Sequence, residues 1–95
     1  MKETEIYALA LKTWGKEPQM LQVIEEMSEL TKEILKNINR NRNNIPELIE
    51  ETADVEIMLA QLKQCYGIEN EVAAYKSQKL EKIRFRLDEF NKKAI

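Results

Sequence analysis

The chain has 95 residues, of which 43% are hydrophobic and 34% charged, with only two glycines and two prolines. This composition predicts one small domain over residues 1–95. The sequence contains no run of about eighteen consecutive apolar residues, so neither a membrane span nor a membrane partner is expected. Cys65 is the single cysteine, so an internal disulfide is excluded and a reducing compartment, the cytoplasm, is expected. The absence of histidine excludes Ser-His-Asp chemistry and the usual zinc sites.

Charge is unevenly distributed along the chain. The net charge of −2 gives no reason to expect a nucleic-acid partner. Residues 17–56 contain ten acids and four bases, net −6, whereas residues 76–93 contain seven bases and three acids, net +4. If the fold brings these two segments together, the acidic surface could bind a metal ion and the basic surface a polyanion. Because a chain this short buries a small core, we also expect it to be an oligomer.

Two helices are predicted in the first half of the chain. Apolar residues at helical spacing indicate a short helix over 3–14, which Gly15 ends. A continuous apolar stripe then predicts a long amphipathic helix over 18–38, with Pro18 in its first turn.

Two further helices are predicted in the second half. Asn44 and Glu47 resemble a capping box at the start of a helix over 45–66, and Gly67 is placed to end it as a left-handed cap. A fourth helix is predicted over 69–92. Its expected inward residues are Val72, Leu80, Ile83, Leu87 and Phe90. No strand pattern occurs, so the fold class is all-α: a four-helix chain that forms a helical bundle, completed by dimerisation.

Two pairs of carboxylates are the strongest chemical signal. Glu26 and Glu29 are three residues apart, as are Glu51 and Asp54, so each pair leaves one face of its helix. The pairs lie about 16 Å and 11 Å from the intervening turn, so an antiparallel hairpin brings them to nearly the same height. A group of carboxylates that contains no histidine or thiolate ligand favours binding of Mg²⁺ or Mn²⁺. The alternative to a metal site is a solvated acidic stripe on the helix surfaces.

The two motifs together resemble a known family. E-E-x-x-E over residues 25–29, followed by E-x-x-D over 51–54, is similar to the MazG-like nucleoside triphosphate pyrophosphohydrolases. These belong to an all-α superfamily with the dimeric dUTPases, dCTP pyrophosphatases and phosphoribosyl-ATP pyrophosphatases. The resemblance extends over about residues 10–87 and includes Trp14 and Gln19 ahead of the first motif.

The resemblance implies a Mg²⁺-dependent hydrolysis of a (d)NTP to the (d)NMP and pyrophosphate by metal-activated water. Glu26, Glu29, Glu51 and Asp54 would be the Mg²⁺ ligands, with Mn²⁺ as the alternative ion. Glu25 would act with Glu26 in catalysis by helping to orient the attacking water. A homodimer or a dimer of dimers is implied.

Substrate contacts are expected from two other groups of residues. The candidates for phosphate binding share one flank of the fourth helix: Lys76, Lys79, Lys82 and Arg86. The alternative is a solvated basic face. Trp14 could stack on the base and Gln19 could read its edge, although Trp14 is equally compatible with a core position.

Two other functions stay open at this point. One is a catalytically silent dimeric helical interaction module, in which the acidic pairs are surface residues. The other is a phosphoribosyl-ATP pyrophosphatase within the same superfamily.

Overall fold

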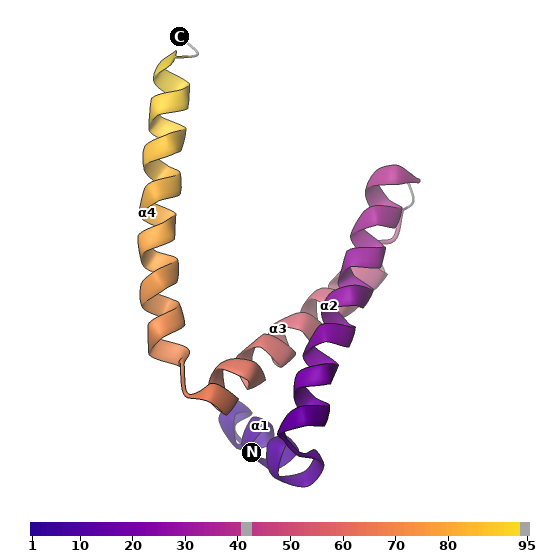
Figure 1. Cartoon of the computed structure of the whole chain (residues 1–95). Helices are drawn as coiled ribbons and strands as arrows, with labels where there is room; N and C mark the ends of the chain where they lie inside the picture. Colours follow the sequence, from indigo (N-terminus) through magenta and orange to yellow (C-terminus); the bar gives the residue numbers. More distant parts are fainter. Residues whose placement is uncertain (41–42, 94–95) are drawn as a thin grey trace.

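The protein is entirely helical over the residues that the computed structural model describes, 1–40 and 43–93. Its helices are α1 (Glu3–Trp14), α2 (Lys16–Asn39), α3 (Ile45–Tyr66) and α4 (Glu69–Lys93), as Figure 1 shows. The four predicted helices and the all-α class are therefore confirmed. None of the described helices is long and apolar enough to cross a membrane.

The core lies where α1, α2 and α3 meet. α2 and α3 run alongside each other as a hairpin, and α1 packs against both near one end of that hairpin (Figure 1). Each of these three helices contributes one buried apolar side chain among the described residues, namely Tyr7, Val23 and Met58. The Tyr7 hydroxyl donates a hydrogen bond to the Glu3 carboxylate one turn earlier. So few buried apolar residues make a small core.

Asn44 connects the start of α3 to α2. Its side-chain amide donates to the Glu33 backbone oxygen at 2.9 Å and to the Glu33 carboxylate at 3.0 Å. Its side-chain oxygen accepts a hydrogen bond from the Asn37 amide at 3.0 Å. The side chain makes no capping hydrogen bond to α3, so the predicted capping box with Glu47 is wrong. Asn44 is only 1% exposed, and its side chain turns into the hairpin because the groups of α2 satisfy it there.

A glycine joint separates α3 from α4. Gly67 is left-handed, with φ 64° and ψ 37°, which confirms the predicted cap. Its N–H donates to the Gln64 oxygen at 3.2 Å, and the Ile68 N–H donates to the Lys63 oxygen at 3.0 Å. This pair of bonds is the Schellman motif, which satisfies the last carbonyl groups of α3. These bonds end α3 just before α4 begins at Glu69.

α4 projects away from the other helices. Among the described residues it contacts only α3, near the joint, and Figure 1 shows it rising alone from that point. No residue of α4 is buried, so the prediction that Val72, Leu80, Ile83, Leu87 and Phe90 face inward is wrong for the single chain. The radius of gyration is 17.4 Å, whereas a compact domain of this length has about 12 Å. The chain alone is a three-helix core with a projecting helix.

Candidate metal centre

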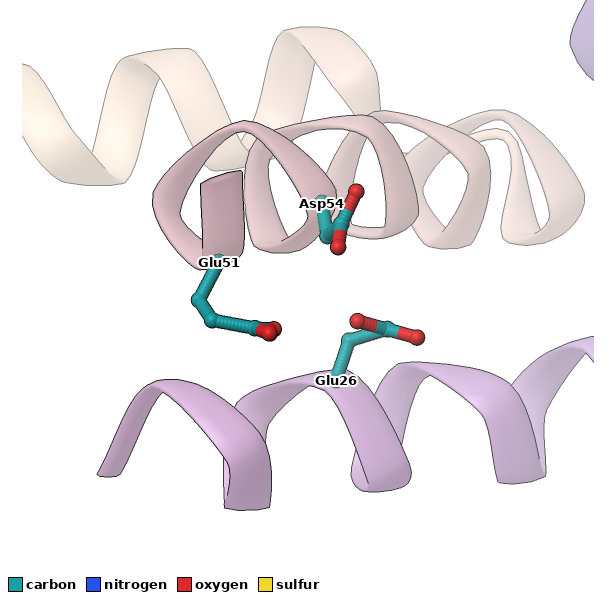
Figure 2. A group of neighbouring side chains, drawn as sticks. All are labelled: Glu26, Glu51 and Asp54. Atoms are coloured by element: carbon teal, nitrogen blue, oxygen red, sulfur yellow. The ribbon is translucent and has the colours of Figure 1, made fainter. Parts of the chain in front are cut away.

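Three carboxylates meet between α2 and α3. Glu26 extends from α2 toward Glu51 and Asp54, which extend from α3 toward it (Figure 2). One oxygen from each side chain lies within 4.8 Å of the other two. The i, i+3 spacing places Glu51 and Asp54 on one face of α3, and the hairpin sets that face against Glu26. The predicted convergence of the acidic motifs is confirmed for these three residues.

Glu51 is the most perturbed member of this group. Its Oε2 atom is buried and has no hydrogen-bond partner. Burial raises the pKa of the Glu51 carboxyl above its ordinary value, and the negative charges of Asp54, Glu26, Glu50 and Glu29 raise it further. A buried carboxylate oxygen with no donor is unfavourable unless a proton or a cation neutralises it. This oxygen is the observation that fits a bound cation.

Gln22 positions Glu26 and had no role in the sequence-based prediction. Its amide donates a hydrogen bond of 2.8 Å to Glu26 Oε1 from one turn earlier on α2. Glu26 is half-buried, so this bond restricts the direction in which its carboxylate points. The i, i+4 spacing of an amide and a carboxylate is the signal in the sequence that indicates such a pair.

The predicted base-binding residues lie at the α1–α2 boundary. Trp14 is 64% exposed, so the alternative that it belongs to the core is wrong for the single chain. The side-chain oxygen of Gln19 accepts a hydrogen bond of 2.7 Å from Gln61 of α3, which is itself buried. Gln61 was missed because it follows Met58 by three residues at a position where an apolar residue is expected. Base binding by Trp14 and Gln19 stays a prediction.

The remaining predicted acids lie around the three-residue group. Glu29 is half-buried one turn after Glu26 and contributes to the raised pKa of Glu51, but it is outside the closest group. Glu25 is exposed, because adjacent residues point about 100° apart around a helix. The roles of Glu29 as a ligand and of Glu25 in orienting water stay predictions.

The predicted phosphate-binding residues are not brought to this site within one chain. All four are exposed on α4, which contacts no helix other than α3 in the described part of the chain: Lys76, Lys79, Lys82 and Arg86. Their binding of phosphate stays a prediction.

In the part of the chain that the structure describes, no ion pair joins a positive side chain to the acidic group. The ion pairs of the described residues are local to one helix and none includes the three carboxylates: Glu33–Lys36, Glu81–Arg84 and Glu89–Lys92. Three converging carboxylate oxygens provide the kind of oxygen ligands that Mg²⁺ and Mn²⁺ prefer. The donor set therefore fits a hard divalent cation.

Comparison with family models, curated proteins and solved structures found no match for this chain. The resemblance to the MazG-like enzymes stays a prediction from the two acidic motifs. The residues of the site and their geometry are therefore the basis for inferring a function.

Proposed function

We propose that the protein is a Mg²⁺-dependent nucleoside triphosphate pyrophosphohydrolase. The carboxylates of Glu26, Glu51 and Asp54 would hold the ion, with Glu29 as a fourth ligand. The observation that carries this proposal is the buried Glu51 Oε2, which has no donor and lies beside two other carboxylates. A buried carboxylate without a cation is an uncompensated negative charge, which is unfavourable. The group of three carboxylates is therefore stable only when a cation or a proton neutralises it.

The bound ion and the residues around it would have different roles in hydrolysis. When bound, Mg²⁺ supplies positive charge to phosphate oxygens and lowers the pKa of water. Gln22 holds the Glu26 carboxylate in one orientation through its hydrogen bond. Glu25, which is exposed on the same helix, would help to orient the attacking water. Hydrolysis needs positioning and charge neutralisation more than covalent chemistry, which matches a site without histidine.

The substrate would be held by residues outside the acidic group. We expect Lys76, Lys79, Lys82 and Arg86 to bind phosphate oxygens, because a triphosphate is a polyanion and these side chains form the basic part of the chain. The exposed Trp14 ring would stack on the base, with Gln19 reading its edge.

The test is pyrophosphate release from a panel of dNTPs, NTPs and phosphoribosyl-ATP, in Mg²⁺ or in EDTA. Release should require Mg²⁺ and should fall by at least about 100-fold in Glu51→Gln, since even indirect partners of a metal contribute about 10–100-fold. Glu56→Gln, an exposed acid on the same helix, is the matched control and should keep full activity.

Other outcomes assign the alternatives. Release from phosphoribosyl-ATP in preference to every common nucleotide would make the protein a phosphoribosyl-ATP pyrophosphatase. A folded protein that hydrolyses nothing in Mg²⁺ or Mn²⁺ would contradict the proposal and favour the silent interaction module.

A further inference from the structure

Two glutamine side chains meet where α2 and α3 face each other. The Gln61 amide of α3 donates a hydrogen bond of 2.7 Å to the side-chain oxygen of Gln19 on α2. Gln61 is only 2% exposed, whereas Gln19 is half-buried and therefore within reach of a ligand. A buried amide keeps such a bond, because water cannot replace it. The orientation of the Gln19 amide is thus set by a residue of another helix.

The glutamine pair lies in line with the acidic group. Gln19 is seven residues before Glu26 on α2, and Gln61 is seven residues after Asp54 on α3. Seven residues are almost two helical turns, so each pair of positions shares one face and is about 10 Å apart along the helix. The buried apolar residues of α2 and α3 lie between the two polar layers. This separation is comparable with the length of a nucleoside monophosphate.

Other contacts hold the same end of the hairpin in place. The Lys16 ammonium group lies 4.4 Å from the centroid of the Tyr66 ring, which joins the start of α2 to the end of α3. The Gln64 amide donates a hydrogen bond of 3.1 Å to the Thr4 backbone oxygen, which joins α3 to α1. Gln19 is therefore presented from a region that three helices hold together, and a pre-organised group loses little entropy when it binds a ligand.

The bond from Gln61 determines which part of the Gln19 amide meets a ligand. A glutamine amide has an acceptor oxygen and an NH₂ group with two donors. The oxygen of Gln19 is occupied by Gln61, and its NH₂ group has no hydrogen-bond partner within the described residues. Rotation of the Gln19 amide alone would set its NH₂ group against that of Gln61 and remove the bond. Gln19 therefore presents a hydrogen-bond donor.

A fixed donor discriminates between nucleobases by the group opposite it. Uracil, thymine, guanine and hypoxanthine carry a keto oxygen, which accepts a hydrogen bond, where cytosine and adenine carry an amino group, which donates. A donor set against an amino group leaves both without a partner. A site that is built to pair a polar group of its substrate rejects the analogue that lacks that group.

We propose that Gln61 is a positioning residue for base selection. By holding Gln19 as a donor, it makes the protein prefer nucleotides whose base presents a keto oxygen over those whose base presents an amino group. This inference rests on the proposed function, in which Gln19 reads the edge of the base, and deepens it by naming the class of base.

The first test needs no variant. Isothermal titration calorimetry of the full chain in Mg²⁺ measures the affinity for the non-hydrolysable α,β-imido analogues of dUTP, dCTP, dITP and dATP. The members of each pair, dUTP with dCTP and dITP with dATP, differ chiefly in the keto or amino group. The keto member should bind at least about 10-fold more tightly in both pairs. Equal affinities, or tighter binding of the amino members, overturn the proposal.

The second test removes the hydrogen bond. Gln61→Met replaces the amide by an apolar side chain of similar length, so the Gln19 amide is free to rotate and the two members of each pair should bind equally. Gln64→Met is the matched control, because it removes a hydrogen bond from α3 to α1 and should keep the wild-type preference. A purely structural role of Gln61 would lower both affinities and leave their ratio unchanged, which overturns the proposal.

The third test does not depend on the stability of the Gln61→Met variant. Gln19→Glu introduces a carboxylate, which accepts the hydrogen bond from Gln61 and offers only acceptors to a ligand. The preference should then shift toward the amino members, dCTP and dATP. A preference for the keto members that is as large as in the wild type overturns the proposal.

These measurements separate the two proposals, because binding is measured without turnover. A keto preference in a protein that releases no pyrophosphate contradicts the proposed hydrolysis and leaves the role of Gln61 in place. Pyrophosphate release without a keto preference contradicts the role of Gln61 alone. Absence of binding of all four analogues overturns the base selection.

Discussion

At Glu51, burial and the neighbouring carboxylates change the same pKa in the same direction. The folded-state pKa lies above the ordinary value of 4.5, so the folded protein binds this proton more tightly than the unfolded chain does. In metal-free protein, the contribution of Glu51 to the free energy of unfolding therefore falls as the pH rises from 4.5 through the folded-state pKa.

The raised pKa of Glu51 leads to a prediction for the variant Glu51→Gln in EDTA. The variant should melt at a higher temperature than the wild type at neutral pH, because it removes a negative charge that is partly buried and is repelled by the neighbouring carboxylates. The difference should shrink as the pH is lowered toward 4.5, where wild-type Glu51 becomes protonated. Thermal melts by circular dichroism across this range measure it. Equal melting temperatures of the wild type and Glu51→Gln at every pH would contradict the raised pKa of Glu51. Glu56→Gln, which changes an exposed acid on the same helix, is the control.

At the scale of secondary structure, the hairpin of α2 and α3 is the element that assembles the site. Its alignment sets Glu26 opposite Glu51 and Asp54. Asn44 contributes to this alignment because its buried side chain makes three hydrogen bonds with groups of α2. The side chain that begins α3 thus also determines how α3 lies along α2.

Asn44→Ala tests this role. Loss of the buried hydrogen bonds should lower the free energy of unfolding by about 1–3 kcal/mol. The measurement is urea denaturation followed by circular dichroism. Asn43→Ala is the matched control, because Asn43 is the exposed neighbour, and such surface changes stay within about 0.5 kcal/mol. Equal effects of the two variants would show that the Asn44 bonds do not hold the hairpin.

At the scale of the whole molecule, stability is limited by a core that only three helices share. Among the described residues, its buried apolar side chains are Tyr7, Val23 and Met58, and α4 adds none. Anything that binds the folded state alone then raises stability by mass action. A cation between α2 and α3 would do so directly, because its ligands come from both helices.

Mg²⁺ should therefore raise the melting temperature of the wild type. The expected stabilisation is about 2.7 kcal/mol when the ion is at 100 times its dissociation constant. Glu51→Gln should lose most of this gain, and Glu56→Gln should keep it. Melts in Mg²⁺ and EDTA that coincide for the wild type would contradict the metal centre.

Much of the candidate site was predictable because its parts are local. The i, i+3 pairs and the distances to the turn were enough to predict that Glu26 meets Glu51 and Asp54. The buried Gln61 and the tertiary bonds of Asn44 were not predictable, since each depends on which groups a neighbouring helix presents. Propensity at Asn44 favoured a cap, and the packing of α2 overrode it.

Helix boundaries and the acidic motifs followed from the order of residues alone, because helical periodicity, the glycine at the end of α3 and the i, i+3 spacing are short-range properties. Where α4 lies did not. Its apolar stripe predicted that α4 packs against a partner, but such a stripe is the same whether that partner belongs to the same chain or to another. Only the tertiary structure showed that α4 contacts α3 and none of the other described helices, because the packing of a helix depends on residues far away in the sequence.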